Sequence, residues 1–126
     1  MKKKIINTPA APQPIGSYNQ AIMVDETLYI SGQIALDPIT GILMTETIEQ
    51  QSHLVMKNLE AILEAADMNF NHVVKTTIFL MDMNDFAKVN EVYASYFEKD
   101  FPARETVQVA GLPRGVAVEI AMIACK

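Results

Sequence analysis

Two strand-like runs near the end of the chain constrain the fold more than any other part of the sequence. They lie in residues 101–124 and are joined by Leu112-Pro113-Arg114-Gly115, whose proline and glycine are typical of a turn. Arg104 interrupts the first apolar run, and Glu119 interrupts the second. Because a charge inside a buried strand costs several kcal/mol unless it is paired or used, the pattern predicts a β-hairpin that carries two functional ions.

The period of two in a β-strand assigns these side chains to faces. Arg104 shares one face of the first strand with Thr106 and Gln108. In the second strand, expected over residues 116–124, Glu119 shares its face mainly with alanines. The small neighbours leave room beside that carboxylate.

The remaining periodicities predict a single α+β domain over residues 1–126. A helix is expected to begin at Thr47, because Thr47 and Gln50 match a capping box and apolar residues recur after them at helical spacing. The expected elements are, in order, a strand through residues 5–6, a hairpin of strands 18–24 and 28–32, the helix from Thr47, a strand over 73–81, a helix carrying Phe86, Val89, Tyr93 and Phe97 and capped by Asp82 or Asn84, and the two C-terminal strands. This order is typical of a six-stranded mixed sheet with two helices packed on one face.

Charge and composition narrow the classes of function. The net charge of -5 and the pI near 4.9 disfavour non-specific nucleic-acid binding, which depends on Lys and Arg. The single cysteine, Cys125, excludes an internal disulfide and fits a reducing compartment. No apolar run approaches the ~20 residues of a membrane span, and the N-terminal residues lack the apolar core of a signal peptide. The sequence therefore predicts a cytoplasmic protein that does not enter a membrane.

Common catalytic and metal-binding patterns are missing from the sequence. His53 and His72 are not spaced as a helical pair and no cysteine cluster accompanies them, so we expect surface histidines and no metal site. Ser31 lacks the local pattern of a nucleophile and is expected to donate a hydrogen bond or to shape a loop. Asn90 stands four residues after Phe86 on the apolar stripe of the second helix, so its amide is expected to bond nearby backbone or to line a site.

Several short segments carry a resemblance that extends in order over nearly the whole chain. They are Ile15-Gly16-Ser17-Tyr18-Asn19-Gln20-Ala21, Ser31-Gly32-Gln33-Ile34, Asn58-Leu59 with Ile62-Leu63, Val89-Asn90-Glu91-Val92-Tyr93, Phe101-Pro102-Ala103-Arg104, Leu112-Pro113-Arg114 and Val118-Glu119-Ile120. With these segments the chain resembles the RidA/YjgF/YER057c/UK114 family of reactive-intermediate deaminases, which act on enamines and imines.

The resemblance implies a chorismate-mutase-like α+β fold, a homotrimer whose sheets form a central barrel, and sites at the clefts between subunits. The implied activity is that of a 2-iminobutanoate/2-iminopropanoate deaminase, which hydrolyses 2-imino acids such as the tautomer of 2-aminoacrylate. By analogy, Arg104 holds the substrate carboxylate and Glu119 positions or activates the attacking water. The implied substrate-binding residues are Tyr18, Ser31, Gly32, Asn90, Arg104 and Thr106.

The physical chemistry of these residues agrees with the resemblance. The rigid fork of an arginine grips a carboxylate through two parallel hydrogen bonds, which suits a small 2-imino acid. Hydrolysis of an imine needs only an oriented water and proton transfer, so no metal or organic cofactor is expected. Three positions depart from the family pattern, namely Ser17, Glu105 and Ala121, and they bear on substrate preference and on the electrostatics of the rim.

Three alternatives remain open at this point. Arg104 and Glu119 could pair with each other across adjacent strands and serve only to stabilise the hairpin. The same Arg104 pocket could bind a small acid in a regulatory trimer without turnover. An RNA-associated or endoribonuclease role is ascribed to some relatives, although the acidic charge balance disfavours it.

Overall fold

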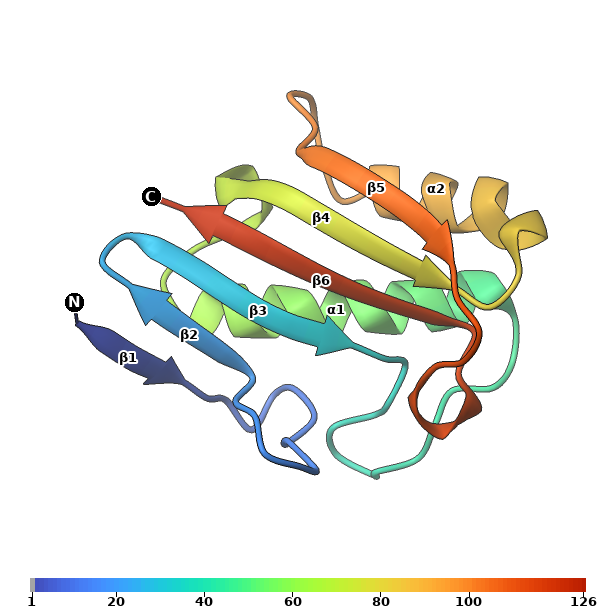
Figure 1. The fold of residues 1–126 in the computed structure, drawn as a ribbon, viewed down its shortest axis with the longest axis horizontal. Coiled ribbons are helices and arrows are strands. Elements are labelled where there is room, and N and C mark those ends of the chain that lie inside the picture. The colour runs from blue at the N-terminus through green and yellow to red at the C-terminus, as the bar shows by residue number, and fades with distance from the viewer. Residues whose placement is uncertain (1) are drawn as a thin grey trace.

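The computed structural model describes residues 2–126 as one mixed sheet covered by helices on one side (Figure 1). The strands are β1 (Lys3–Ile6), β2 (Ala21–Val24), β3 (Thr27–Gln33), β4 (Val73–Leu80), β5 (Ala103–Gln108) and β6 (Val118–Cys125). The α-helices are α1 (Ile48–Ala65) and α2 (Phe86–Ala94), and the short 3-10 helices are η1 (Phe70–His72), η2 (Met83–Asp85) and η3 (Pro113–Gly115). The predicted order of strands and α-helices is confirmed.

The strands lie side by side in the order β1-β2-β3-β6-β4-β5 (Figure 1). Only β4 and β5 run parallel, and the other neighbouring pairs are antiparallel. The parallel pair is joined through α2, as a crossover connection requires. The predicted six-stranded mixed sheet is therefore confirmed.

The predicted hairpin of the two C-terminal strands is wrong, because β6 lies between β3 and β4 and does not pair with β5. The turn at residues 112–115 is present, but the chain then passes beyond β4. Every second residue of β6 is buried, so this strand belongs in the centre of the sheet. None of the residues of β5 is fully buried, and β5 forms an edge. The turn residues predicted a change of direction, which by itself does not specify the strand that pairs.

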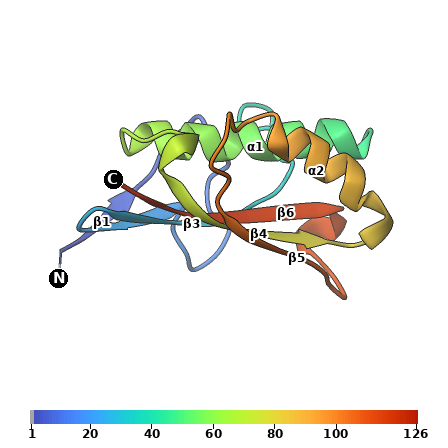
Figure 2. The same ribbon diagram turned by 90° about the horizontal axis from the view of Figure 1, so that it is seen from above.

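Both α-helices cover the same face of the sheet (Figure 2). Thr47 caps α1 and forms the predicted capping box with Gln50. The apolar stripe of α1 is buried against the sheet, and Val55, Leu59 and Ile62 have no exposed surface. This packing of an amphipathic helix on the sheet forms the core.

Two predicted boundaries differ from the observed ones by three residues, and the others differ by no more than two. The strand expected from residue 18 begins at Ala21, and the buried side chain of Gln20 bonds the loop that precedes it. The second helix ends at Ala94, so Phe97 lies beyond it, although its ring still packs 4.9 Å from that of Tyr93. Neither proposed cap, Asp82 or Asn84, caps α2, whose N-cap is Asp85; Asp82 instead caps the short helix η2, where it accepts a hydrogen bond from the Asn84 N–H.

The other face of the sheet carries no α-helix (Figure 2). We call it the open face; it includes Ile22 and Tyr29, which pair across β2 and β3, and Ile123 of β6. Tyr29 is 49% exposed, and Val107 at the β5 edge is 41% exposed. No helix within residues 2–126 has the length and apolar character needed to cross a bilayer.

Candidate active site

Arg104 lies on the edge strand β5 and points to the helix-covered side of the sheet. Its Nη1 donates a hydrogen bond of 2.7 Å to Asn90 Oδ1 in α2. The guanidinium carbon lies 5.1 Å from the ring centre of Tyr93 and 5.5 Å from that of Phe86, within the range of a cation–π interaction. Three side chains of α2 therefore hold the guanidinium in place.

A cavity of about 380 Å³ opens beside this guanidinium. Its lining includes Arg104, Asn90, Tyr93 and Phe101. Within residues 2–126, the only hydrogen bond that the guanidinium donates is the one to Asn90, and no carboxylate pairs with it. Since a guanidinium has five N–H donors, most of the fork remains available to an anion in the cavity.

The Tyr93 side chain, over whose ring Arg104 lies, is anchored to the sheet by a hydrogen bond. The Tyr93 hydroxyl is buried and donates a 2.9 Å hydrogen bond to Thr76 Oγ1 of β4, the strand residue that pairs with Arg104. Burial raises the pKa of Tyr93, so its hydroxyl stays protonated and continues to donate. Sequence reasoning assigned Phe86 and Tyr93 to the core stripe alone. Their spacing from Asn90 at helical intervals was the signal that all three share one face.

Thr106 follows Arg104 on the same side of β5. Its Oγ1 is buried and has no hydrogen-bond partner in the part of the chain that the structure describes. An unpartnered buried hydroxyl costs free energy, so this position is suited to a partner from outside the chain. Gln108, the next residue on this side, is already engaged, because its Oε1 accepts a 2.7 Å hydrogen bond from the Met83 N–H.

Glu119 lies on the open face of β6, opposite Phe79 of β4. Its carboxylate rests against Gly32 of β3, and in the described residues it has no hydrogen-bond or ion-pair partner. Burial raises the pKa of this carboxyl above the usual value of 4.5. A half-buried carboxyl of this kind can exchange a proton nearer to neutral pH than an ordinary glutamate.

Tyr18 and Ser31 line a second cavity, of about 440 Å³, on the open face. Ser31 donates through Oγ to the Asn19 carbonyl at 2.6 Å, and its N–H donates to the Gln20 carbonyl at 2.9 Å. Ser31 therefore has the loop-shaping role expected of it, and it fixes the segment that carries Tyr18.

Arg104 and Glu119 lie on opposite faces of the sheet. Arg104 pairs with Thr76, on the buried side of β4, whereas Glu119 pairs with Phe79, on the alternate side. The alternative of a stabilising ion pair between them is therefore wrong. Within one chain the structure separates Arg104, Asn90 and Thr106 on the helix side from Glu119, Tyr18, Ser31 and Gly32, which belong to the open side or its margin.

Glu105, one of the three departures, points to the open face and not toward Arg104. Its carboxylate lies 3.3 Å from Lys75 Nζ and accepts a 3.0 Å hydrogen bond from Thr77 Oγ1. These three groups form a neutral polar cluster across β4 and β5. Sequence reasoning missed Lys75, because only the parallel pairing of these strands brings it beside Glu105.

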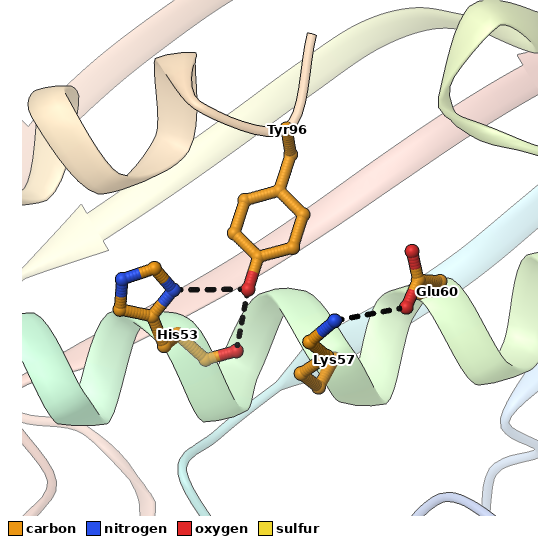
Figure 3. Close-up of polar contacts among 4 residues, drawn as sticks. All are labelled: His53, Lys57, Glu60 and Tyr96. Carbon is orange, nitrogen blue, oxygen red and sulfur yellow. Dashed lines mark hydrogen bonds and ion pairs between the residues drawn. The ribbon is translucent and has the colours of Figure 1, made fainter.

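No group of three or more His, Cys, Asp and Glu side chains within residues 2–126 is placed to hold a metal ion. His53 lies on the outer side of α1, where its Nδ1 is 3.0 Å from the Tyr96 hydroxyl (Figure 3). Lys57 and Glu60 form an ion pair of 3.4 Å farther along the same helix (Figure 3). His72 accepts a hydrogen bond from the Asn69 N–H and belongs to a capping box. None of these residues lines either of the two cavities.

Comparisons with known proteins agree with this arrangement. The family model described as Endoribonuclease L-PSP matches residues 8–126. A mouse protein named 2-iminobutanoate/2-iminopropanoate deaminase is 52% identical over 122 residues, which make up 97% of this chain and 90% of the mouse protein.

Two solved structures show the same fold. YyfA from Yersinia pestis, described as a protein of unknown function of the conserved Rid family, is 46% identical, with a TM-score of 0.96 over 99% of this chain and 100% of its own. TdcF from E. coli, solved with bound serine, is 40% identical, with a TM-score of 0.94 over 98% of each chain.

Proposed function

This chain belongs to the RidA/YjgF family, and from that membership we propose that it is an enzyme which hydrolyses 2-imino acids to 2-keto acids and ammonia. Relatives from mouse, rat and human that are 48–52% identical to it carry the name 2-iminobutanoate/2-iminopropanoate deaminase. The predicted activity agrees with these names, and the predicted fold agrees with the solved structures of relatives. The roles of individual residues and the assembly are our own proposals.

The observation that carries the proposal is the state of Arg104. The guanidinium is held between two aromatic rings and Asn90, faces a cavity, and pairs with no carboxylate of the described chain. A cation that is fixed but left unpaired is suited to an anionic ligand, and the fork geometry matches a carboxylate. We assign the carboxylate of the 2-imino acid to this site, with Thr106 beside it.

The positions of Arg104 and Glu119 support assembly into a trimer. One chain presents them on opposite faces, so a site that uses both takes one from each of two copies. The open face is uncovered and carries exposed apolar side chains such as those of Tyr29 and Val107, and β5 is an exposed sheet edge; a second copy would bury these surfaces. We therefore place the substrate between copies, with Arg104 from one and Glu119, Tyr18 and Ser31 from its neighbour.

The chemistry needs a single water and no redox step. An enamine such as 2-aminoacrylate first takes a proton at its terminal carbon and becomes the 2-imino acid. Water then adds to C2 of the protonated imine, a C–O bond forms, and the released proton passes to Glu119. Glu119 returns the proton to the carbinolamine nitrogen, the C–N bond breaks as the oxygen lone pair forms the C=O bond, and ammonia leaves. The hydroxyl proton passes to Glu119 and from there to ammonia or solvent, which gives the keto acid and restores the carboxylate. The raised pKa of Glu119 suits both transfers, because its two protonation states are then closer in free energy near neutral pH.

The direct test uses freshly generated 2-aminoacrylate and follows the release of ammonia and pyruvate. The wild-type chain should accelerate both in a 1:1 ratio, and Glu119→Gln should lower the rate by roughly 10²–10⁴, the usual scale of acid–base catalysis. Equal rates with and without the protein would refute the proposal.

Two other functions make different predictions in the same assay. A regulatory trimer without turnover would gain thermal stability from a 2-keto acid while releasing no ammonia. The family description includes endoribonuclease, so RNA cleavage should be measured with the same preparation. The net charge of -5 leads us to expect no RNA cleavage.

The single cysteine supports a reducing compartment, and we propose that the protein is located in the cytoplasm.

A further inference from the structure

The carboxylate of Glu119 occupies space that only a glycine leaves free. A Cβ built on Gly32 would lie 2.5 Å from Glu119 Oε2, 2.7 Å from Cδ and 2.9 Å from Cγ. Each of these separations is shorter than ordinary van der Waals contact between such atoms. The side chain of Glu119 therefore lies directly on the backbone of β3.

Backbone conformation does not explain the glycine at this position. The glycines with positive φ are Gly41 and Gly115, and Gly32 is not among them. A residue with a side chain could adopt the backbone of Gly32. The space taken by Glu119 is what excludes it.

The local irregularity of the sheet contributes to this contact. Ile30 pairs with Met122 and Gln33 pairs with Ile120, so three steps along β3 match two steps along β6. The extra residue is a β-bulge at Ser31 and Gly32, and bulges of this kind re-aim side chains next to functional sites. The bulge brings the Gly32 backbone under Glu119.

We propose that Gly32 is a positioning residue for Glu119. Because Gly32 has no side chain, the Glu119 carboxylate can lie against β3, at the place where it exchanges protons with the substrate. The inference rests on the proposed function, in which Glu119 moves protons. It gives Gly32 a role that acts through a second side chain and is separate from any contact of Gly32 with the substrate.

The surroundings of Glu119 leave Gly32 as its main constraint. Phe79 of β4 stands opposite it, and Ala121 is the next residue of β6 on the same face. The charged and titratable side chains on the same face of the neighbouring strands are Tyr29 on β3, Lys75 on β4 and Glu105 on β5. Lys75 and Glu105 pair with each other, and neither bonds Glu119.

Gly32→Ala should displace the carboxylate without affecting the Arg104 cavity on the other face. A displacement of about 1 Å at a reacting group can lower a rate by about 10²-fold, so we expect kcat to fall by that order while KM changes less than about threefold. The displaced carboxylate meets more water, so the pKa of Glu119, followed by carbon-13 NMR, should fall toward 4.5. The matched control is Gly111→Ala, because a Cβ at Gly111 meets no atom within 4 Å.

Double variants separate positioning from a general effect on folding. In the Glu119→Gln background, Gly32→Ala should lower kcat by less than about threefold, since the proton-transferring group is already absent. In the Glu119→Ala background, the three atoms nearest to the added methyl are gone, so Gly32→Ala should leave Tm unchanged even if the single variant folds poorly.

Two results would overturn the inference. One is a Gly32→Ala variant with the wild-type kcat and an unshifted pKa for Glu119. The other is an equal loss of kcat on adding Gly32→Ala to Glu119→Gln. A different outcome, full activity of Glu119→Gln itself, would refute the proposed role of Glu119, while the NMR and Tm measurements would still test whether Gly32 positions the carboxylate.

Discussion

Replacing Arg104 with lysine keeps the positive charge and removes the geometry that holds it. In the wild-type chain the guanidinium donates a hydrogen bond of 2.7 Å to Asn90 and lies over the rings of Tyr93 and Phe86. Its remaining N–H donors are available to the cavity that Arg104 lines. A lysine ammonium is a compact charge on a flexible stem, so it cannot bond Asn90 and a carboxylate with the same paired geometry.

The expected loss follows from these contacts. Truncating one partner of a hydrogen-bonded charge pair costs roughly 2–5 kcal/mol, and the retained charge of lysine places the loss near the lower end, about 2–3 kcal/mol. At about 1.4 kcal/mol per decade this lowers kcat/KM roughly 30- to 140-fold. Most of the loss should appear as a higher KM, because the carboxylate is bound in the ground state as well as in the transition state.

Steady-state kinetics with 2-iminopropanoate and thermal unfolding at a fixed protein concentration test this reasoning together. Arg104 is half-buried on an edge strand, so Tm should fall by only a few degrees. A wild-type KM in Arg104→Lys would refute the assignment of the carboxylate to this guanidinium. A large fall in Tm with unchanged kinetics of the folded fraction would show that Arg104 is structural.

Three further outcomes are expected. Gln20→Leu should destabilise the fold by roughly 2–4 kcal/mol in denaturant unfolding. The reason is that Gln20 Oε1 accepts a hydrogen bond from the Thr8 N–H at 2.8 Å and Nε2 donates to three loop carbonyls, all of which would lose their partner. A change below about 0.5 kcal/mol, the size of an ordinary surface substitution, would contradict this expectation. Folding raises the pKa of Glu119, so the contribution of Glu119 to stability is present below the unfolded pKa near 4.5 and is lost as pH rises through the folded pKa. The Tm of Glu119→Gln minus the Tm of the wild type should therefore increase from acid to neutral pH. A difference that does not change with pH would argue against the raised pKa. Ile123→Asp, on the open face, should convert the proposed trimer to monomers in analytical ultracentrifugation and abolish turnover, whereas an assembly that survives the substitution would place the interface elsewhere.

Local patterns in the sequence predicted most of the fold. The cap at Thr47, the stripe of α1 and the alternation of β6 each depend on residues that are close in sequence, so periodicity and side-chain chemistry identify them. The partner of β5 depends on contacts between distant segments. Two adjacent strands joined by a turn usually pair, and here the buried pattern of β6 favours the centre of the sheet instead.

The candidate site shows the same division. Arg104 and Glu119 are charged residues within apolar runs, so the sequence alone identifies both as functional candidates. Their placement on opposite faces follows from the register of both strands on β4, which no local pattern encodes. The contact between Gly32 and Glu119 likewise depends on a bulge that the sequence does not mark.

The separation of Arg104 and Glu119 across the sheet has a genetic consequence if each site is shared between copies. A chain with Arg104→Lys still carries a sound Glu119, and a chain with Glu119→Gln still carries a sound Arg104. When the two defective chains are unfolded together and reassembled at random, roughly one quarter of the intersubunit clefts combine the two sound halves. Two defective alleles of this protein would then complement each other in one cell, and a cross between them would regain part of the wild-type activity.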